Sequence, residues 1–355
     1  MAGMLRSPLG LPLKGNLSHN QKNPTFADLM KAYTYAKYGS PEELKLEEVP
    51  KPEPKEKEVL VKVHTAAIND YDWSMVRGRP YAYRLLFGLT KPKHPIPGME
   101  LAGTVEAVGP GVTRFKVGDA VYGDTSAFGF GTFAEYIAVN EKAFILKPEQ
   151  MSFEEACTVS HASMLALQAL VDLGKIKNNQ KILINGAGGG VGTFGLQIAK
   201  EYAAEVTGVD SGEKLRMMEE LGFDHIIDYK KGDFTKNGKQ YDLILDCKTN
   251  RSPFAYARAL KPEGHYVTVG GTLNRLLQMM LFKGWIAKFH KKYLDILPLK
   301  PNKGLEKMNE LYEAGKIKCI IDGPYPMEKI PWAIQYFGEG KHSGKVVIDM
   351  QRSID

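Results

Sequence analysis

Apolar residues in the first half of the chain fall in short runs that alternate with turns rich in proline, glycine and charged residues. Such runs are typical of strands. They predict strands at residues 31–35, 44–49, 58–64, 101–108 and 120–122. Short strands punctuated by turns indicate a barrel-like unit in this part of the chain.

The hydrophobic spacing becomes helical from about residue 153, and beyond residue 181 strand-like runs alternate with helical ones. The strands predicted there are residues 181–185, 205–209, 225–227, 241–245 and 265–269. This alternation predicts a parallel sheet with helices on both faces. The tail, from about residue 298, ends in a further strand-like run at residues 344–349.

A glycine-rich turn follows the first strand of this second half. Its glycines are Gly186, Gly188, Gly189, Gly190 and Gly192, and an amphipathic helix continues from them. The first N–H groups of a helix carry partial positive charge, and glycines let a pyrophosphate approach the backbone closely. The next strand ends at Asp210, roughly the twenty residues further on that a dinucleotide-binding unit requires. The pattern therefore predicts a dinucleotide site at this turn.

The composition narrows the classes of function. The chain has 355 residues, 43% hydrophobic and 25% charged, which indicates about two globular domains. The net charge is only +6, and the 47 Lys and Arg residues are scattered among 41 Asp and Glu, so we expect no nucleic-acid binding. Cys157, Cys247 and Cys319 lie far apart, which argues against a disulfide framework and a structural zinc site. We find no apolar run near the roughly eighteen residues of a membrane span.

The first thirty residues are poor in acidic side chains and contain Arg6, Lys14 and Lys22. They have two interpretations, an organelle-targeting segment or an arm that lies on the body of the protein. The segment lacks the arginine-rich amphipathic pattern of targeting peptides. We therefore expect an arm and a cytoplasmic location, with an organelle matrix as the alternative.

Several longer strings, in the right order, resemble the medium-chain dehydrogenase/reductase superfamily, and within it the zinc-free quinone oxidoreductase branch. They are Ala67 to Trp73, Pro97 to Gly103, Val108 to Val112, Phe115 to Asp119, Gly131 to Tyr136, the glycine turn, Asp228-Tyr229 and Leu260 to Gly264. The resemblance implies an α/β fold, with a Rossmann nucleotide-binding domain and a GroES-like, partly open β-barrel catalytic domain. It divides the chain into an arm (1–31), the catalytic domain (32–155), the Rossmann domain (156–297) and a return to the catalytic domain (298–355).

Zinc-containing members of the superfamily have a histidine where this chain has Met99 and a cysteine where it has Asn69. A thioether is a poor zinc ligand and a neutral amide a worse one, so we expect no metal. Without a Lewis acid, the substrate itself has to accept hydride readily, as quinones and carbon–carbon double bonds conjugated to a carbonyl do. The expected function is a zinc-independent NAD(P)H-dependent reductase of such small molecules.

Two other functions stay open at this point. One is a non-catalytic dinucleotide-binding sensor or structural protein, because the fold survives the loss of chemistry. The other is an alcohol dehydrogenase-type member of the superfamily.

Three residues are candidates for catalysis. Asn69 resembles a polar residue that lines the nicotinamide pocket in the family, and its amide could donate to a substrate oxygen. It is equally interpretable as a residue that caps the next helix. Tyr71 is a second donor candidate or a core aromatic. His161, with Ser160, stands where the family has an apolar pair, and is either a proton relay or an exposed histidine at a helix start.

The resemblance also indicates which residues hold the cofactor. The turn contributes Gly186, Gly188, Gly189, Gly190, Val191 and Gly192, and Gly270 lies after a later strand. Asp210 favours NADH, because a carboxylate accepts from both ribose hydroxyls and repels a 2′-phosphate. Ser211, Lys214, Tyr229 and Lys345 favour NADPH. We expect NADPH, with NADH left open.

Residues 273–292 form a predicted helix that is rich in Met, Leu, Trp and Phe and carries five Lys or Arg. Such a helix suits a membrane surface, the cover of a substrate cleft or a dimer contact. We expect a homodimer and no membrane partner.

Overall fold

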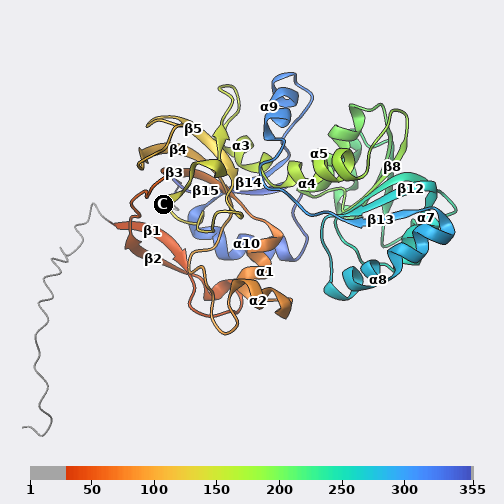
Figure 1. The fold of residues 1–355 in the computed structure, drawn as a ribbon, viewed down its shortest axis with the longest axis horizontal. Helices are drawn as coiled ribbons and strands as arrows, with labels where there is room; N and C mark the ends of the chain where they lie inside the picture. The colour runs from red at the N-terminus through yellow and green to blue at the C-terminus, as the bar shows by residue number, and fades with distance from the viewer. Residues whose placement is uncertain (1–28, 353–355) are drawn as a thin grey trace, which may run out of the picture.

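The computed structural model describes residues 29–352, and two large sheets dominate it (Figure 1). Most of the predicted arm, residues 1–28, lies outside the described residues. The strands of one sheet come from both ends of the chain, and those of the other come from its middle. This arrangement places the central segment as one layered unit beside a unit that the two ends build together.

The middle of the chain forms a six-stranded sheet in which every neighbouring pair is parallel. Across the sheet its strands are β10 (His225–Asp228), β9 (Glu205–Asp210), β8 (Lys181–Asn185), β11 (Tyr241–Asp246), β12 (Leu260–Thr268) and β13 (Tyr293–Ile296). In chain order this is 3-2-1-4-5-6, the order of the dinucleotide-binding Rossmann sheet. The order reverses between β8 and β11, so the crevice for a ligand lies beyond the carboxyl ends of these strands.

The two ends of the chain form the second sheet, which has seven strands. Its order is β14 (Ile321–Pro326), β15 (Lys345–Asp349), β3 (Glu58–Ala67), β4 (Glu100–Val108), β5 (Ala120–Asp124) and β7 (Ile145–Leu146), with β6 (Tyr136–Asn140) also paired to β3. Val347 of the tail lies opposite Ala67 in antiparallel register. The predicted α/β fold with a Rossmann domain and a GroES-like barrel domain is therefore confirmed.

A separate two-stranded sheet joins β1 (Leu29–Thr34) to β2 (Lys45–Pro50). β1 begins inside the range predicted for the arm, and residue Ala32 also forms an antiparallel bridge to Ala134. The domain boundaries stay a prediction, but this strand connects the residues after position 28 to the barrel side of the molecule.

Helices cover both faces of the Rossmann sheet and close the ends of the barrel (Figure 1). They are α1 (Asp70–Arg77), α2 (Arg84–Phe87), α3 (Phe153–Val159), α4 (Ala162–Leu167), α5 (Gly190–Lys200), α6 (Leu215–Leu221), α7 (Pro253–Ala259), α8 (Leu273–His290), α9 (Leu305–Glu313) and α10 (Ile330–Gly338). Within residues 29–352 one helical stretch, Phe153–Leu173, has the length and hydropathy of a membrane span, and 78% of it is buried inside the protein. It is a core helix that runs between the two units.

Burial patterns explain why each strand lies where it does. Ile182, Leu183 and Ile184 of β8 are all fully buried, because helices cover both faces of a parallel sheet. In β3, Val59, Val61 and Val63 are buried at alternate positions and face the barrel core. Each such side chain contributes roughly 1.5–3 kcal/mol when it leaves water.

Candidate active site

The glycine turn after β8 has backbone conformations and close approaches that require glycine. Gly186 has a φ of +92°, in the left-handed region. A Cβ on Gly192 would lie 2.5 Å from the backbone of Ala187, and one on Gly190 would lie 2.6 Å from the side chain of Lys345. The turn therefore packs the first residues of α5 directly against Ala187 and Lys345.

The start of α5 offers donors for an anion. The N–H groups of Val191 and Gly192 make no hydrogen bond to any residue in the described part of the chain, whereas Thr193 N–H donates to Gly189 and a parallel bridge joins Gly189 to Gly344. Free N–H groups and the helix dipole together bind phosphate. Because glycines have no side chain, a pyrophosphate can approach this turn closely, and the free N–H groups can donate to its oxygens.

Basic side chains surround the same turn. Lys214 packs against Gly188, and His342 Nε2 lies 3.8 Å from where a Gly189 Cβ would sit. Burial, together with the charges of Lys214, Lys248 and Lys345, lowers the pKa of His342 to about 3. His342 is therefore neutral near pH 7, and the lysines carry the positive charge of this region.

Asp210 is held at the end of β9, facing the turn. Its Oδ2 accepts from Gly188 N–H at 2.8 Å, and its Oδ1 accepts from Ser211 N–H at 2.8 Å. Lys214 Nζ lies 3.8 Å from Oδ1, and burial lowers the pKa of this lysine. Tyr229, half-exposed, donates its N–H to the backbone carbonyl of Asp210. The acid and the cationic neighbour predicted for the ribose thus lie together.

Gly270 follows β12, at the same edge of the sheet as the turn and Asp210. Nothing lies within 4 Å of where its Cβ would be, so its surface is open to a ligand. Parallel strands place their carboxyl ends at one edge, which explains why these distant residues meet.

The ammonium of Lys345 has two buried partners. Its Nζ lies 2.6 Å from Glu100 Oε2 and 2.6 Å from Asn69 Oδ1, in a buried ion pair. Its aliphatic chain covers Gly190 of the turn, and its charge acts on His342 together with those of Lys214 and Lys248. That Lys345 takes part in cofactor binding stays a prediction.

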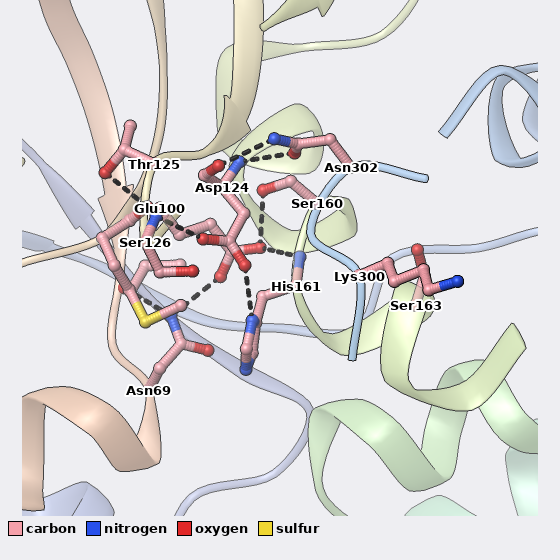
Figure 2. Close-up of polar contacts among 12 residues, drawn as sticks. Asn69, Glu100, Asp124, Thr125, Ser126, Ser160, His161, Ser163, Lys300 and Asn302 are labelled. Carbon is pink, nitrogen blue, oxygen red and sulfur yellow. Dashed lines mark hydrogen bonds and ion pairs between the residues drawn. The ribbon is translucent and has the colours of Figure 1, made fainter. Parts of the chain in front are cut away.

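Glu100 is the centre of this cluster. Its Oε1 accepts from Ser160 Oγ at 2.8 Å and from His161 N–H at 2.6 Å, and its Oε2 accepts from Asn69 Nδ2 at 2.9 Å (Figure 2). Oε2 also accepts from Lys345 Nζ. A buried carboxylate requires such partners, because an unpaired buried charge costs several kcal/mol. The cluster joins the barrel, the α3–α4 junction and the tail.

The amide of Asn69 has no free donor for a substrate. One Nδ2 hydrogen goes to Glu100 and the other to the carbonyl of Ala67 at 3.2 Å. Asn69 also begins α1, where its own N–H donates to Asp72 Oδ2 at 2.8 Å. The prediction that this amide donates to a substrate oxygen is therefore wrong, because the buried cluster uses both hydrogens.

His161 and Asp124 form a hydrogen-bonded pair. His161 lies at the junction of α3 and α4, and its Nδ1 is 2.7 Å from Asp124 Oδ2 (Figure 2). Burial raises the pKa of Asp124, but the hydrogen bonds from His161 and Ser126 outweigh it, and the pKa lies below the ordinary value. The carboxylate is therefore ionised near pH 7. It accepts from Nδ1–H, which fixes the tautomer of the imidazole.

The other ring nitrogen of His161 is available. Nε2 makes no hydrogen bond to residues 29–352, and it is not among the buried polar atoms without a partner, so it keeps contact with solvent. The rest of the side chain is buried, at 8% exposure. Ala162, the next residue, approaches Gly190 of the turn. The helix that His161 begins therefore packs against the predicted cofactor site.

Aromatic side chains line the barrel side of this histidine. Tyr71 meets the ring of His161 edge-on at 6.1 Å, and Tyr83 stacks on Tyr71 at 6.3 Å. Phe87 contacts both tyrosines and also Phe130. Burial raises the pKa of Tyr71, so its hydroxyl keeps its proton near pH 7.

Two of the three predicted catalytic residues, Tyr71 and His161, therefore lie together, and Asn69 lies in the cluster behind them. We did not predict Asp124 or Glu100 as functional residues. Asp124 is the last residue of β5, a carboxylate at the end of a strand, which is the signal that could have identified it. Among residues 29–352, no three His, Cys, Asp or Glu side chains are grouped as metal ligands.

Comparisons with known proteins agree with this architecture. Residues 55–149 match the family model described as an alcohol dehydrogenase GroES-like domain, and residues 221–348 match one described as a zinc-binding dehydrogenase. The chain is 32% identical to a chloroplast envelope quinone oxidoreductase homolog of Arabidopsis thaliana, over 90% of this chain and 98% of that protein. It is also 32% identical to a chloroplastic NADPH-dependent alkenal/one oxidoreductase of the same plant, over 90% and 79% of the two chains.

A solved structure is similar over the whole fold. The quinone oxidoreductase from Coxiella burnetii superimposes with a TM-score of 0.79 and 26% sequence identity. The match covers 91% of this chain and 100% of that chain. The chain therefore belongs to the medium-chain dehydrogenase/reductase superfamily, in its zinc-free, quinone oxidoreductase-like branch.

Proposed function

We propose that this protein is an NAD(P)H-dependent reductase of quinones and of carbon–carbon double bonds conjugated to a carbonyl, and that it works without zinc. When bound, the nicotinamide cofactor supplies the hydride. The names of the relatives support this substrate class. The observation that carries the proposal is the His161–Asp124 pair at the α3–α4 junction, because it offers a proton donor on the helix whose first residue, Ala162, packs against the glycine turn.

The residues around the turn would hold the cofactor. The free N–H groups of Val191 and Gly192 suit the pyrophosphate. Ser211, Lys214 and Tyr229 suit a 2′-phosphate, and Asp210 opposes it. We propose a preference for NADPH, supported by the lysines around His342 and by the NADPH-dependent relative.

His161 acts as the proton donor in this proposal. Asp124 holds Nδ1–H, so the proton that leaves is on Nε2. As hydride arrives, negative charge grows on the substrate oxygen, and a donor beside it lowers the barrier. Tyr71 forms a wall against the imidazole and offers a second hydroxyl donor.

The donor set supports a mechanism without zinc. Met99 and Asn69 stand at the ligand positions, and Lys345 neutralises Glu100. A carboxylate whose charge is already neutralised by an ammonium binds a metal cation weakly. Zinc independence remains part of the proposal, and elemental analysis with chelator treatment tests it.

The direct experiment is oxidation of NADPH and of NADH by the purified protein with menadione and 1-octen-3-one. We expect turnover of both acceptors and a decrease of about tenfold in His161→Gln, because water protonates an enolate or a hydroquinone anion more slowly. Cofactor binding without turnover of any acceptor would instead favour the non-catalytic sensor or structural protein.

Location and assembly are also proposals. The homodimer is supported by α8, whose outward side chains Leu273, Leu277, Met280, Leu281, Trp285 and Phe289 are exposed in the single chain. Trp285 packs against Phe254 and Phe289, outside the aromatic group beside His161. Light scattering tests the dimer. The chloroplastic relatives support the organelle alternative to a cytoplasmic location, which localisation of the tagged full chain tests.

A further inference from the structure

We propose that Lys248 is a ligand of the cofactor pyrophosphate, the part that NADPH and NADH share. This role rests on the proposed function, which requires a nicotinamide dinucleotide at the glycine turn. It adds to the site a cation that belongs neither to the turn nor to the group around Asp210, because Lys248 follows β11.

The side chain of Lys248 lies on Gly186, the first glycine of the turn. A Cβ on Gly186 would lie 3.3 Å from Lys248 Cε and 3.5 Å from Lys248 Cγ. The aliphatic chain therefore runs along the backbone just beyond the end of β8. Nζ is bonded to Cε, so the positive charge lies beside the turn.

A buried carboxylate holds the backbone of Lys248 in place. Asp246 Oδ1 accepts from Lys248 N–H at 2.8 Å and from Thr249 N–H at 3.0 Å. The same oxygen accepts from Asn185 Nδ2 at 2.8 Å, and the Asn185 carbonyl accepts from Cys247 N–H at 2.9 Å. These bonds connect the residues after β11 to the end of β8. Lys248 is thus positioned before any ligand binds, which lowers the cost of binding.

Lys248 differs from the two other lysines that lie on glycines of the turn. Lys345 is buried, and its Nζ is bound to Glu100. Lys214 is also buried, and its Nζ lies 3.8 Å from Asp210 Oδ1. Lys248 is exposed, and within residues 29–352 its Nζ forms no hydrogen bond or ion pair, unlike these two. Its charge is therefore available to a bound anion.

The charge of Lys248 acts on groups from both units. Burial is the main cause that lowers the pKa of His342, which lies against Gly189, and the charges of Lys214 and Lys248 add to it. Desolvation raises the pKa of Asp70, the first residue of α1, and Lys248 opposes this more than any other charge does. The ammonium group therefore faces the crevice between the two units.

The strand order favours the pyrophosphate over the 2′-phosphate as the partner of Lys248. β9, which ends at Asp210, and β11, which Lys248 follows, lie on opposite sides of β8 in the sheet. In a Rossmann unit the ribose meets the acid after the second strand, and the pyrophosphate meets the turn after the first. An ammonium donates strongly to phosphate oxygens. Lys248 thus complements the free N–H groups of Val191 and Gly192.

Two nucleotides separate the two phosphate sites. ADP-ribose carries the pyrophosphate without a 2′-phosphate, and adenosine 2′-monophosphate carries the 2′-phosphate without a pyrophosphate. Neither has a nicotinamide ring, so binding is measured without turnover. Isothermal titration calorimetry with the full-length protein gives the Kd of each, and fluorescence titration gives the Kd of NADPH and of NADH.

We expect Lys248→Met to raise the Kd of ADP-ribose, NADH and NADPH by about tenfold each, equivalent to about 1.4 kcal/mol. The Kd of adenosine 2′-monophosphate should not change. Methionine keeps an unbranched chain on Gly186, so the packing of the turn is preserved. Lys248→Arg keeps the charge and should retain most of the affinity. Lys239→Met is the matched control, because Lys239 is exposed and precedes β11, at the opposite edge of the sheet, and it should leave every Kd unchanged.

Unchanged affinity for ADP-ribose in Lys248→Met would overturn the inference. A loss confined to NADPH and adenosine 2′-monophosphate would also overturn it, because the lysine would then serve the 2′-phosphate. An equal loss in Lys239→Met would mean that only the net charge of the protein matters, which again contradicts a contact made by Lys248.

Salt dependence gives a second readout. The Kd of ADP-ribose should rise with sodium chloride less steeply in Lys248→Met than in the wild type, because one charge contact is lost. Equal slopes would contradict the contact.

The proposed function is tested separately. Binding of ADP-ribose that depends on Lys248, in a protein that reduces no acceptor with NADPH or NADH, would support the inference and overturn the proposed function. Reduction of menadione by a protein whose affinity for ADP-ribose does not depend on Lys248 would support the proposed function and overturn the inference.

Discussion

The side-chain amide of Asn302 accepts from the backbone N–H of Asp124 and donates to the backbone carbonyl of Asp124, across 178 residues of sequence. A third hydrogen bond joins Asn302 Nδ2 to the carbonyl of Ala143. Asn302 has a φ of 62°, a left-handed conformation that asparagine tolerates better than most residues. One side chain of the segment between β13 and α9 thus fixes the end of β5 and, through Asp124, the ring of His161.

Replacing this residue should loosen the pair without removing either member. Asn302→Gly keeps the left-handed backbone but loses three hydrogen bonds. We expect a loss of about 1–3 kcal/mol in the free energy of unfolding and a lower kcat with cofactor affinity unchanged. Urea unfolding, steady-state kinetics and fluorescence titration with NADPH measure the three quantities. Unchanged kcat in a folded variant would mean that Asp124 holds its position without Asn302.

Loss of one member of the buried Lys345–Glu100 pair should lower the free energy of unfolding strongly, and loss of both charges should lower it much less. Lys345→Met leaves Glu100 buried without its cationic partner, so we expect a loss of about 3–5 kcal/mol in unfolding free energy. Glu100→Gln added to it neutralises the carboxylate and should restore most of that loss. The measurement is urea unfolding of both variants, and simple additivity of the two changes would contradict the pairing.

Asp210→Asn tests the ribose site more cleanly than a smaller residue does. The amide oxygen can still accept from Gly188 N–H, so the turn keeps its hydrogen bond. The lost negative charge no longer opposes a 2′-phosphate beside Lys214. We expect the NADPH to NADH ratio of kcat/KM to rise by about tenfold, equivalent to about 1.4 kcal/mol. Lys214→Ala should lower the ratio, and no change in either variant would remove both residues from the specificity site.

Asp72 should make stability depend on pH. Burial raises its pKa to about 7, against an opposing hydrogen bond from Asn69 N–H. The folded state therefore prefers the protonated acid, so this stability is fully present below the unfolded pKa and is lost as pH rises through about 7.

Asp72→Asn should remove this dependence, because an amide cannot ionise. Relative to wild type, the variant should gain about 1.4 kcal/mol for each pH unit within that window and differ little at the acid end. Thermal unfolding of both proteins between pH 4 and pH 8 measures the difference. A constant difference across that range would mean that the acid ionises freely in the folded protein.

Local patterns predicted the strands that carry long apolar runs. β3, β4, β8, β9 and β11 all lie within a few residues of the prediction, because their apolar residues alternate or run together. β6, β7, β13 and β14 were not predicted. β7 has two residues and β14 contains two prolines, so neither has a local pattern that identifies a strand, and both are stabilised by their neighbours in the sheet.

The cofactor site was easier to predict than the catalytic one for a physical reason. The glycine turn and Asp210 belong to one local unit, whose spacing is fixed by strand and helix lengths. The partners of Asn69 and Lys345 are 31 and 245 residues distant along the chain, at Glu100. Hydrogen bonds between residues so far apart in sequence leave no local pattern, which is why the amide of Asn69 was predicted to be free and the ion pair of Lys345 with Glu100 was not predicted.

The most direct test of the central claim is the fate of deuterium from NADPH that carries deuterium at both C4 positions, when the protein reduces 1-octen-3-one. The account predicts one deuterium at the β-carbon of the saturated ketone and a solvent proton at the α-carbon, both assigned by NMR. NADPH that binds without delivering its deuterium to any acceptor, or product whose β-hydrogen comes from solvent, would contradict it.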